Sequence, residues 1–301
     1  MRLDRRRFLQ EMLAASAIAG LPSQPARALE VPIAFQLHAV RGLAAKDFPG
    51  TLRAIGRLGY DEVELVSFPG YASPAPRDGF AALAPMSPRA VRDTIEDAGL
   101  TVTSAHFKYE QFDDTRIRNS VEWAHGVGLQ YMTVADLPAA STLDEWKRHT
   151  DSLNTLGERV RNEGMRLALH TQNDFWRAIE GSTVMDAMLA GLGAANCRIQ
   201  LDLSTTQAMG VDAAAFLRRH GSRCFSVHLR DAPTPSPMGG YVYSVALGEG
   251  DLDLEEIFDA AGAARIDKYI VEMQVQPPGD PVEALRRSAQ FVRELRPRMP
   301  Q

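Results

Sequence analysis

A regular alternation of short β-rich runs with amphipathic helical patterns, from residue 30 onward, most constrains the fold. Eight runs rich in β-branched and aromatic residues are expected to be strands, at 32–38, 61–66, 101–107, 131–136, 166–170, 197–203, 224–231 and 268–273. Amphipathic stretches with apolar residues at three- and four-residue spacing are expected to be helices, at 48–59, 87–99, 116–128, 143–164, 181–193, 212–221, 254–264 and 281–296. Strands that alternate with helices predict a parallel sheet covered by helices.

The number of these units selects one architecture. Eight strand–helix units in about 270 residues predict a single (β/α)8 TIM barrel. A doubly wound open sheet is the alternative, but the first expected strand is not followed by the G-x-G-x-x-G turn of the dinucleotide-binding form. No linker or change of composition divides residues 29–301, so we expect them to form one domain.

The first 28 residues have a different character. They combine a basic start, a weakly apolar stretch and a small-residue A-x-A end, which is the layout of an export signal. Arg5 and Arg6, followed by Phe8 and Leu9, resemble the twin-arginine motif. We therefore predict that residues 1–28 are a twin-arginine export signal and that the mature protein is periplasmic; a disordered basic tail is the alternative.

Composition narrows the partners. The net charge is −5 and no basic stripe with interleaved aromatic residues occurs, which argues against a nucleic-acid partner. The sequence contains no window of 18 uninterrupted apolar residues, so we predict no membrane span in the mature form. Cys197 and Cys224 would begin neighbouring strands. Two buried free thiols are expected there, with a disulfide as the alternative.

Titratable residues end all eight expected strands. Histidines end the first, third, fifth and seventh strands, and carboxylates end the others: His38, Glu64, His106, Asp136, His170, Asp202, His228 and Glu272. In a barrel, all carboxyl-terminal strand ends face one cavity. A ring of imidazoles and carboxylates suits a divalent metal, proton transfer or both. Any one of these residues can instead cap a helix or bond the backbone, which is the reading we favour for Asp136.

Two long irregular stretches, 67–86 and 231–250, follow the second and seventh expected strands. They would lie on the face where a barrel builds its site, and long loops there are usually functional. Residues 249–256 crowd five carboxylates at a helix start. An anionic substrate would meet negative charge there, so we expect a neutral sugar or polyol.

Several segments resemble the sugar phosphate isomerase/epimerase family of xylose-isomerase-like barrels. The similar segments are "FQLHAVRGLAAKDFPGTLRAIGRLGYDEVEL" from residue 35, "SAHF" from 104, "LDLSTTQAMG" from 201, "VHLRDAP" from 227, "LGEGDLDLEEIF" from 247 and "YIVEMQ" from 269. They span nearly the whole chain after the export signal. The resemblance implies the barrel fold and a divalent cation, first Mn²⁺, with Mg²⁺, Co²⁺ or Zn²⁺ as alternatives.

The resemblance also implies a set of metal ligands. The family holds its ion with a fifth-strand Glu and with residues that match Asp202, His228 and Glu272. The fifth strand departs from this pattern, because "HTQNDFW" from His170 to Trp176 has no Glu at the expected place. His170, Gln172 or Asp174 can complete the coordination, and we take His170 as the fourth ligand.

Roles for the remaining residues follow from the same likeness. Glu272 is expected to be the main proton-transfer group, with His106 as a second acid. The substrate side is expected to be lined by His38, Glu64, Gln172, Arg230 and Asp231, the last two of which can instead brace His228.

We therefore expect a metal-dependent isomerase or epimerase of a keto-sugar that abstracts a proton next to a carbonyl. Without the fifth-strand Glu, a two-base epimerisation lacks one base. A metal-dependent lyase or dehydratase acting on an oxidised sugar is therefore one alternative. A carbohydrate-binding barrel without catalysis is the other.

Overall fold

A computed structural model of the chain describes residues 32–72, 79–233, 244–266, 268–273 and 279–295. The expected export signal, residues 1–28, and parts of both long loops lie outside these ranges.

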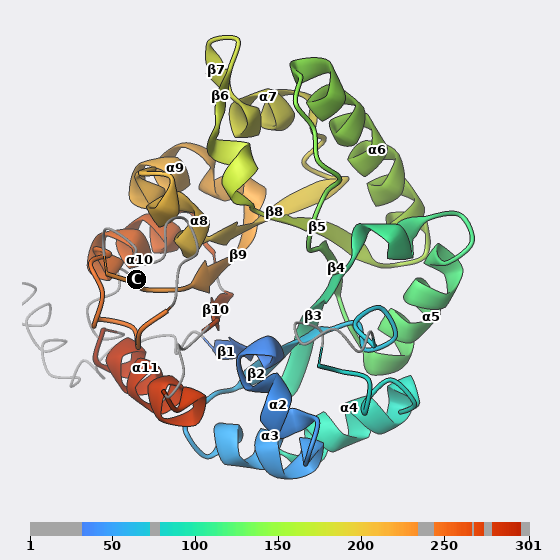
Figure 1. Cartoon of the computed structure of the whole chain (residues 1–301), viewed down its shortest axis with the longest axis vertical. Coiled ribbons are helices and arrows are strands. Elements are labelled where there is room, and N and C mark those ends of the chain that lie inside the picture. Colours follow the sequence, from blue (N-terminus) through green and yellow to red (C-terminus); the bar gives the residue numbers. More distant parts are fainter. Residues whose placement is uncertain (1–31, 73–78, 234–243, 267, 274–278, 296–301) are drawn as a thin grey trace, which may run out of the picture. The chain divides into compact units, whose positions relative to one another are not determined.

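The described strands close into a parallel barrel (Figure 1), which confirms the predicted (β/α)8 fold. The barrel order is β1-β10-β9-β8-β5-β4-β3-β2, and β1 pairs with β10 to close it. The strands are β1 (Ile33–Gln36), β2 (Glu62–Val66), β3 (Thr101–Phe107), β4 (Tyr131–Val134), β5 (Arg166–His170), β8 (Cys197–Asp202), β9 (Cys224–Leu229) and β10 (Tyr269–Val271). A small hairpin of β6 (Ala178–Ile179) and β7 (Ser182–Thr183), which we did not predict, stands apart from the barrel.

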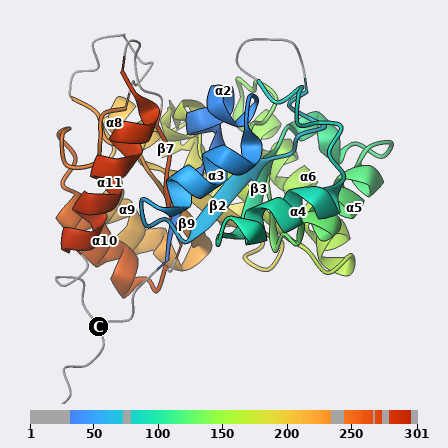
Figure 2. The same cartoon turned by 90° about the horizontal axis from the view of Figure 1, so that it is seen from below.

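Helices surround the barrel, and neighbours such as α3, α4 and α5 pack in sequence along its outside (Figure 2). Eight of them match the predicted stretches: α3 (Phe48–Gly56), α4 (Pro88–Asp97), α5 (Ile117–Val127), α6 (Leu143–Asn162), α7 (Val184–Gly191), α9 (Ala213–His220), α10 (Leu254–Ala263) and α11 (Pro281–Leu295). The short elements α2 (Arg41–Ala44), α8 (Leu203–Ala208), η2 (Leu37–Val40), η3 (Tyr109–Phe112), η4 (Asn173–Trp176) and η5 (Gly221–Arg223) were not predicted. None of the helices within the described ranges is both long and apolar enough to cross a bilayer.

Local capping explains where several helices begin. Thr142 accepts a hydrogen bond from the backbone N–H of Glu145, and the Glu145 carboxylate accepts one from the N–H of Thr142, so α6 starts with a reciprocal capping box. Asp253 accepts from the N–H of Glu256 at the start of α10, as its spacing predicted. Each such cap satisfies backbone donors that the first helical turn leaves without partners.

Apolar side chains fill the space between the barrel and its helices, and one small cluster fills the barrel near its amino-terminal end. There Tyr131 and Phe225 stack with ring centroids 4.2 Å apart, beside Ala168. Cys197 and Cys224 are both buried free thiols, as we expected. This cluster packs the barrel interior near the first residues of the strands. The strand-end imidazoles and carboxylates lie toward the carboxyl-terminal end of the barrel.

Candidate metal centre

The site is built on the inward-facing positions of the strands. Alternate residues of a strand share one face, so the residue two positions before a strand-end ligand points into the same interior. Ser104, Gln200 and Ser226 occupy such positions, before His106, Asp202 and His228 respectively, and all three are buried. We did not single out these inner residues from the sequence, although their spacing of two was the signal that could have identified them.

Four strand-end side chains converge on one point. One ligand atom from each of His170, Asp202, His228 and Glu272 lies within 4.8 Å of the others. They come from the ends of β5, β8 and β9 and from the residue that follows β10. The group is the same one that we predicted as metal ligands. Two imidazoles and two carboxylates at this separation form a donor set of the kind that binds divalent cations.

His228 lies between two glutamates and is fully buried. Its Nε2 is 2.6 Å from Oε2 of Glu64, and its Nδ1 is 2.8 Å from Oε2 of Glu272. Because carboxylates only accept hydrogen bonds, both ring nitrogens act as donors and the ring is protonated. Burial alone would lower the pKa of His228, but the charge of Glu64 and the contacts with both carboxylates raise it to about 10.

Glu64 is held by a network of its own. Its carboxylate accepts hydrogen bonds from Ser104 Oγ at 2.6 Å, Gln200 Nε2 at 2.8 Å and Gln36 Nε2 at 2.9 Å, besides the one from His228. Burial would raise the pKa of Glu64, but the charges of His228 and His106 and the hydrogen bonds from His228 and Ser104 lower it to about 2. We expected Glu64 to line the substrate side; in the structure its carboxylate bonds His228, Ser104, Gln200 and Gln36.

Gln200 orients the second imidazole of the set. Its side-chain oxygen accepts hydrogen bonds from Nδ1 of His170 at 3.0 Å and from Nε2 of His106 at 2.6 Å, while its amide nitrogen donates to Glu64 and Ser226. Nε2 of His170 lies 3.4 Å from Oδ2 of Asp202, on the side of the other predicted ligands. Gln200 therefore orients the ring of His170, and a proton held on Nδ1 by Gln200 would leave Nε2 to bind a cation.

Replacing Gln200 by leucine should weaken metal affinity about 10- to 100-fold, because His170 would lose the acceptor that orients its ring. Titration of the metal-free protein with Mn²⁺, followed by calorimetry, measures this effect. Gln172→Leu is the matched control on the loop after β5, since within the described residues the Gln172 amide donates to the carbonyl of Ala135. Unchanged affinity in Gln200→Leu would contradict the orienting role.

His106 lies close to both imidazoles of the donor set. Its ring stacks on that of His228 with centroids 5.2 Å apart and lies 4.8 Å from that of His170. Burial lowers the pKa of His106 to about 4, although the charge of Glu64 partly opposes this. At neutral pH, His106 is therefore a neutral imidazole whose Nε2–H points at Gln200, next to the predicted ligands.

Arg230 supplies fixed positive charge to the same group. Its Nη1 lies 3.3 Å from Oδ2 of Asp202 and 3.9 Å from Oε1 of Glu272. Burial would raise the pKa of both carboxyls, but the Arg230 guanidinium holds both well below their usual range. Asp202 and Glu272 are consequently ionised at neutral pH.

Asp231 is engaged by the loop that follows β9. Its side chain is fully buried and accepts hydrogen bonds from the backbone N–H groups of Gly248, Gly250 and Leu252 at 2.9, 3.0 and 3.3 Å. A Cβ on Gly250 would lie 2.1 Å from Oδ1 of Asp231, so the close approach requires glycine. We expected Asp231 to line the substrate side or to brace His228; in the structure its carboxylate holds this loop in place.

Asp231→Ala should lower the free energy of unfolding by about 1 to 3 kcal/mol, because three part-buried backbone amides would lose the buried carboxylate that accepts from them. Asp231→Asn keeps one acceptor oxygen, so its free energy of unfolding should lie between those of Asp231→Ala and the wild type. Urea unfolding of the three proteins measures the order. Equal stability of Asp231→Ala and the wild type would show that the loop does not depend on this carboxylate.

The other predicted residues lie on segments that follow their strands. His38 is in η2, with its ring 6.2 Å from that of Phe80. Gln172 donates to the carbonyl of Ala135 at 3.2 Å. Asp136 is exposed and accepts a hydrogen bond from the N–H of Tyr109 at 3.0 Å, so it bonds the backbone as we favoured. Asp174, the other fifth-strand candidate, pairs with Arg177 at 3.1 Å.

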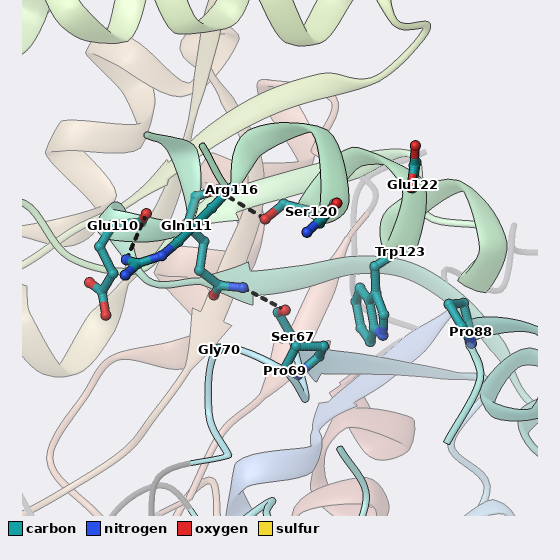
Figure 3. A pocket seen from close by; sticks show the side chains of 11 residues that line it. Ser67, Pro69, Gly70, Pro88, Glu110, Gln111, Arg116, Ser120, Glu122 and Trp123 are labelled. Atoms are coloured by element: carbon teal, nitrogen blue, oxygen red, sulfur yellow. Dashed lines mark hydrogen bonds between the residues drawn. The ribbon is translucent and has the colours of Figure 1, made fainter. Parts of the chain in front are cut away.

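A separate cavity of about 600 Å³ lies beside the barrel (Figure 3), between the segments that follow β2 and β3 and the helices α4 and α5. Gln111 donates to Ser67 across its floor at 2.8 Å, and Ser120 and Trp123 reach it from α5. None of the predicted site residues lines it. This cavity is therefore distinct from the ring of imidazoles and carboxylates.

Comparison with solved structures supports the fold. A sugar phosphate isomerase/epimerase from Parabacteroides distasonis ATCC 8503 aligns with a TM-score of 0.72 and 20% identity, over 87% of this chain and 98% of the other. The IOLI protein with a bound zinc atom aligns with a TM-score of 0.69 and 15% identity, over 90% of this chain and 99% of the other. A probable 3-DHS dehydratase, AsbF, from Bacillus anthracis aligns with a TM-score of 0.67 and 12% identity, over 87% of this chain and 98% of the other. At these identities, the likeness shows the fold alone.

Comparison at the level of sequence gives the family. No curated protein sequence matches the chain. The family model described as xylose isomerase-like TIM barrel matches residues 52–295, which include seven of the eight barrel strands and all but one of the described strand-end residues that form the ring. The chain therefore belongs to the xylose isomerase-like TIM barrel family.

Proposed function

We propose that the protein is a divalent-metal-dependent isomerase or epimerase of a neutral keto-sugar or polyol-derived ketose. The observation that carries the proposal is the convergence of His170, Asp202, His228 and Glu272, whose ligand atoms lie within 4.8 Å of one another. A relative in this fold is described as a sugar phosphate isomerase/epimerase and another as holding zinc, which supports the same class of chemistry.

The charges of the group fit a divalent cation. Glu64, Asp202 and Glu272 are three buried carboxylates. Their partners within the ring are Arg230 and the proton of His228, which leaves one negative charge without compensation. A divalent cation bound in exchange for that proton would bring the group to neutrality. Burying unbalanced charge is costly, so this donor set favours an ion of charge two.

The types of donor atom narrow the choice of metal ion. Imidazole suits zinc and other transition metals, whereas carboxylate also suits Mg²⁺ and Mn²⁺. A set with two of each is suited to Mn²⁺, Co²⁺ or Zn²⁺ better than to Mg²⁺, and we keep Mn²⁺ as the first choice. His170, Asp202, His228 and Glu272 would hold it, with Glu64 and Gln200 orienting the two imidazoles.

The reaction we propose is proton transfer at the carbon next to a carbonyl. His170, Asp202, His228 and Glu272 would hold a divalent cation, which would supply positive charge where negative charge develops on the carbonyl oxygen. Glu272 is ionised and therefore able to accept the proton. Arg230, which bridges Asp202 and Glu272, can donate to a substrate oxygen from the same side. Glu272, once protonated, can return the proton to the neighbouring carbon, while the Nε2–H of the neutral His106 stays on Gln200.

A metal-dependent dehydratase is the second candidate, and one observation favours it. His170 ends the fifth strand, which has no Glu at the place where the family is expected to carry one, and its ring lies 4.8 Å from that of His106, so Glu272 is the ligand carboxylate that we assign to proton transfer. A single carboxylate that acts first as base and then as acid suits elimination of water next to a carbonyl as well as it suits isomerisation. The relative from Bacillus anthracis is described as a probable dehydratase.

Incubation with unphosphorylated ketoses in deuterated water tests the proposal. We expect metal-dependent incorporation of deuterium next to the carbonyl, and an isomeric sugar as product. A dehydrated product would select the second candidate. A sugar that binds without exchange in the metal-loaded protein would contradict both and favour a binding protein.

We further propose that the twin-arginine route exports the protein with its ion already enclosed, because this route carries folded proteins and Arg5-Arg6 resembles its motif. Replacing both arginines by lysine should leave the protein in the cytoplasm, as measured by cell fractionation. Unchanged export of the double variant would refute the assignment of residues 1–28.

A further inference from the structure

We infer that the end of the barrel opposite the candidate metal centre carries an anion site for phosphate or a phosphate monoester. A cavity of about 480 Å³ opens there beside the first residues of β4, β5 and β8. Three arginines line it, Arg161 from α6, Arg166 from β5 and Arg198 from β8, and we call them the arginine pocket. Arg166 begins the strand that His170 ends, so about 13 Å of extended chain separates this pocket from the metal centre.

Each arginine is anchored through part of its guanidinium. Nη1 of Arg161 donates to the carbonyl of Ala195 at 3.2 Å and to Oδ1 of Asn196 at 2.6 Å. Nη1 of Arg166 donates to the Tyr131 hydroxyl at 3.3 Å, and the guanidinium carbon lies 5.6 Å from the centre of that ring. These contacts fix where each group lies while other N–H donors of the same guanidinium remain to bind an oxyanion.

Arg198 is held most firmly of the three. Its Nε donates to the carbonyl of Arg223 at 3.1 Å and its Nη2 to that of Cys224 at 2.5 Å. All the acceptors that anchor the three arginines are neutral oxygens, from backbone carbonyls, one amide and one hydroxyl. The positive charge of the arginine pocket is thus positioned by groups that do not neutralise it.

The charge balance points to an anionic ligand. The chain has 38 acidic and 33 basic residues, yet none of the ion pairs found within the described ranges involves Arg161, Arg166 or Arg198. Most exposed arginines elsewhere are paired, for example Arg159 with Asp114 at 2.6 Å. Three like charges around one cavity repel each other unless an anion joins them.

The packing of α6 brings these charges together. A Cβ at Gly157 would lie 2.0 Å from the carbonyl oxygen of Asn196, so glycine lets the helix lie directly on residues 194–196. Arg161 follows one turn later and reaches the same segment. Guanidinium groups bind planar or tetrahedral oxyanions through paired N–H donors, and a phosphate group with its three or four oxygens can engage several of them at once.

Titration of the full chain with inorganic phosphate tests the inference, with chloride at matched ionic strength as the reference. We expect saturable binding by calorimetry and a rise in the unfolding temperature, since a ligand of the folded state stabilises it. Arg166→Gln should weaken phosphate binding at least 10-fold, and Arg166→Lys should restore part of it. Arg159→Gln, a surface variant on α6 outside the pocket, should bind as the wild type does.

Two further arms make the outcome specific. Asp202→Asn, at the metal centre, should bind phosphate as the wild type does, which separates this site from the proposed function. Glycerol 3-phosphate that binds more tightly than inorganic phosphate would identify a phosphorylated metabolite as the source, and equal affinities would identify the free ion. The inference is overturned if no saturable binding occurs by about 10 mM phosphate, if Arg166→Gln binds as the wild type does, or if Asp202→Asn abolishes binding.

Discussion

Replacing Glu272 by glutamine is expected to lower kcat by about 10³-fold or more while leaving the fold intact. The Glu272 carboxylate is ionised, because Arg230 and His228 hold its pKa well below the usual range. An amide of the same shape cannot accept the proton that the proposed reaction removes. Rates of turnover and of deuterium exchange, measured on the ketose substrate, should fall together.

The same variant must be separated from loss of the ion, because Glu272 is also one of the four predicted ligands. Metal content of each sample is therefore measured together with its rate, and the rate is expressed per bound ion. Asp136→Asn is the matched control, since Asp136 lies two residues after the end of β4 but is exposed and bonds the backbone of Tyr109. Activity per ion within a few-fold of wild type in Glu272→Gln would move the proton transfer to another group.

His228→Ala should reduce bound metal from near one ion per chain to a small fraction of that. The imidazole lies between Glu64 and Glu272, and its removal leaves two buried carboxylates without the group that links them. Loss of one ligand of four also removes the closed geometry on which tight binding depends. Elemental analysis after gel filtration measures the stoichiometry.

A ligand exchange at the fifth strand provides the matched comparison. His170→Glu keeps a ligand atom at the end of the fifth strand, so it should retain about one ion per chain while His170→Ala should not. Circular dichroism establishes that each variant is folded. Full metal content in His228→Ala would contradict its assignment as a ligand, whatever the behaviour of the His170 variants.

The fold was predictable because the sequence repeats one unit eight times. Each long helix carries its own apolar spacing and each strand its own β-rich run, so the alternation was visible without knowledge of long-range contacts. Short elements such as α8 and η2 were missed. They arise where Asp202 and Gln36 cap the turn that follows their strands, and this depends on contacts with neighbouring strands.

The ligand set was predictable for a similar reason, because a barrel brings all its strand ends to one face. The roles of Glu64, Gln200 and Asp231 were not. Which strand-end carboxylate meets which imidazole depends on how β2 and β9, which do not pair with each other, face one another across the barrel interior, and no local pattern encodes it. Asp231 follows a predicted ligand by three residues, yet its side chain turns toward the amides of residues 248–252.

Anomalous X-ray scattering from a crystal of the protein grown with Mn²⁺ tests the central claim most directly. We predict one strong anomalous peak about 2.0 to 2.6 Å from His170 Nε2, a ring nitrogen of His228 and the carboxylates of Asp202 and Glu272. If crystals grown with excess Mn²⁺ showed no anomalous peak among these four side chains, or a peak only elsewhere on the protein, the assignment of this ring as a metal centre would be contradicted.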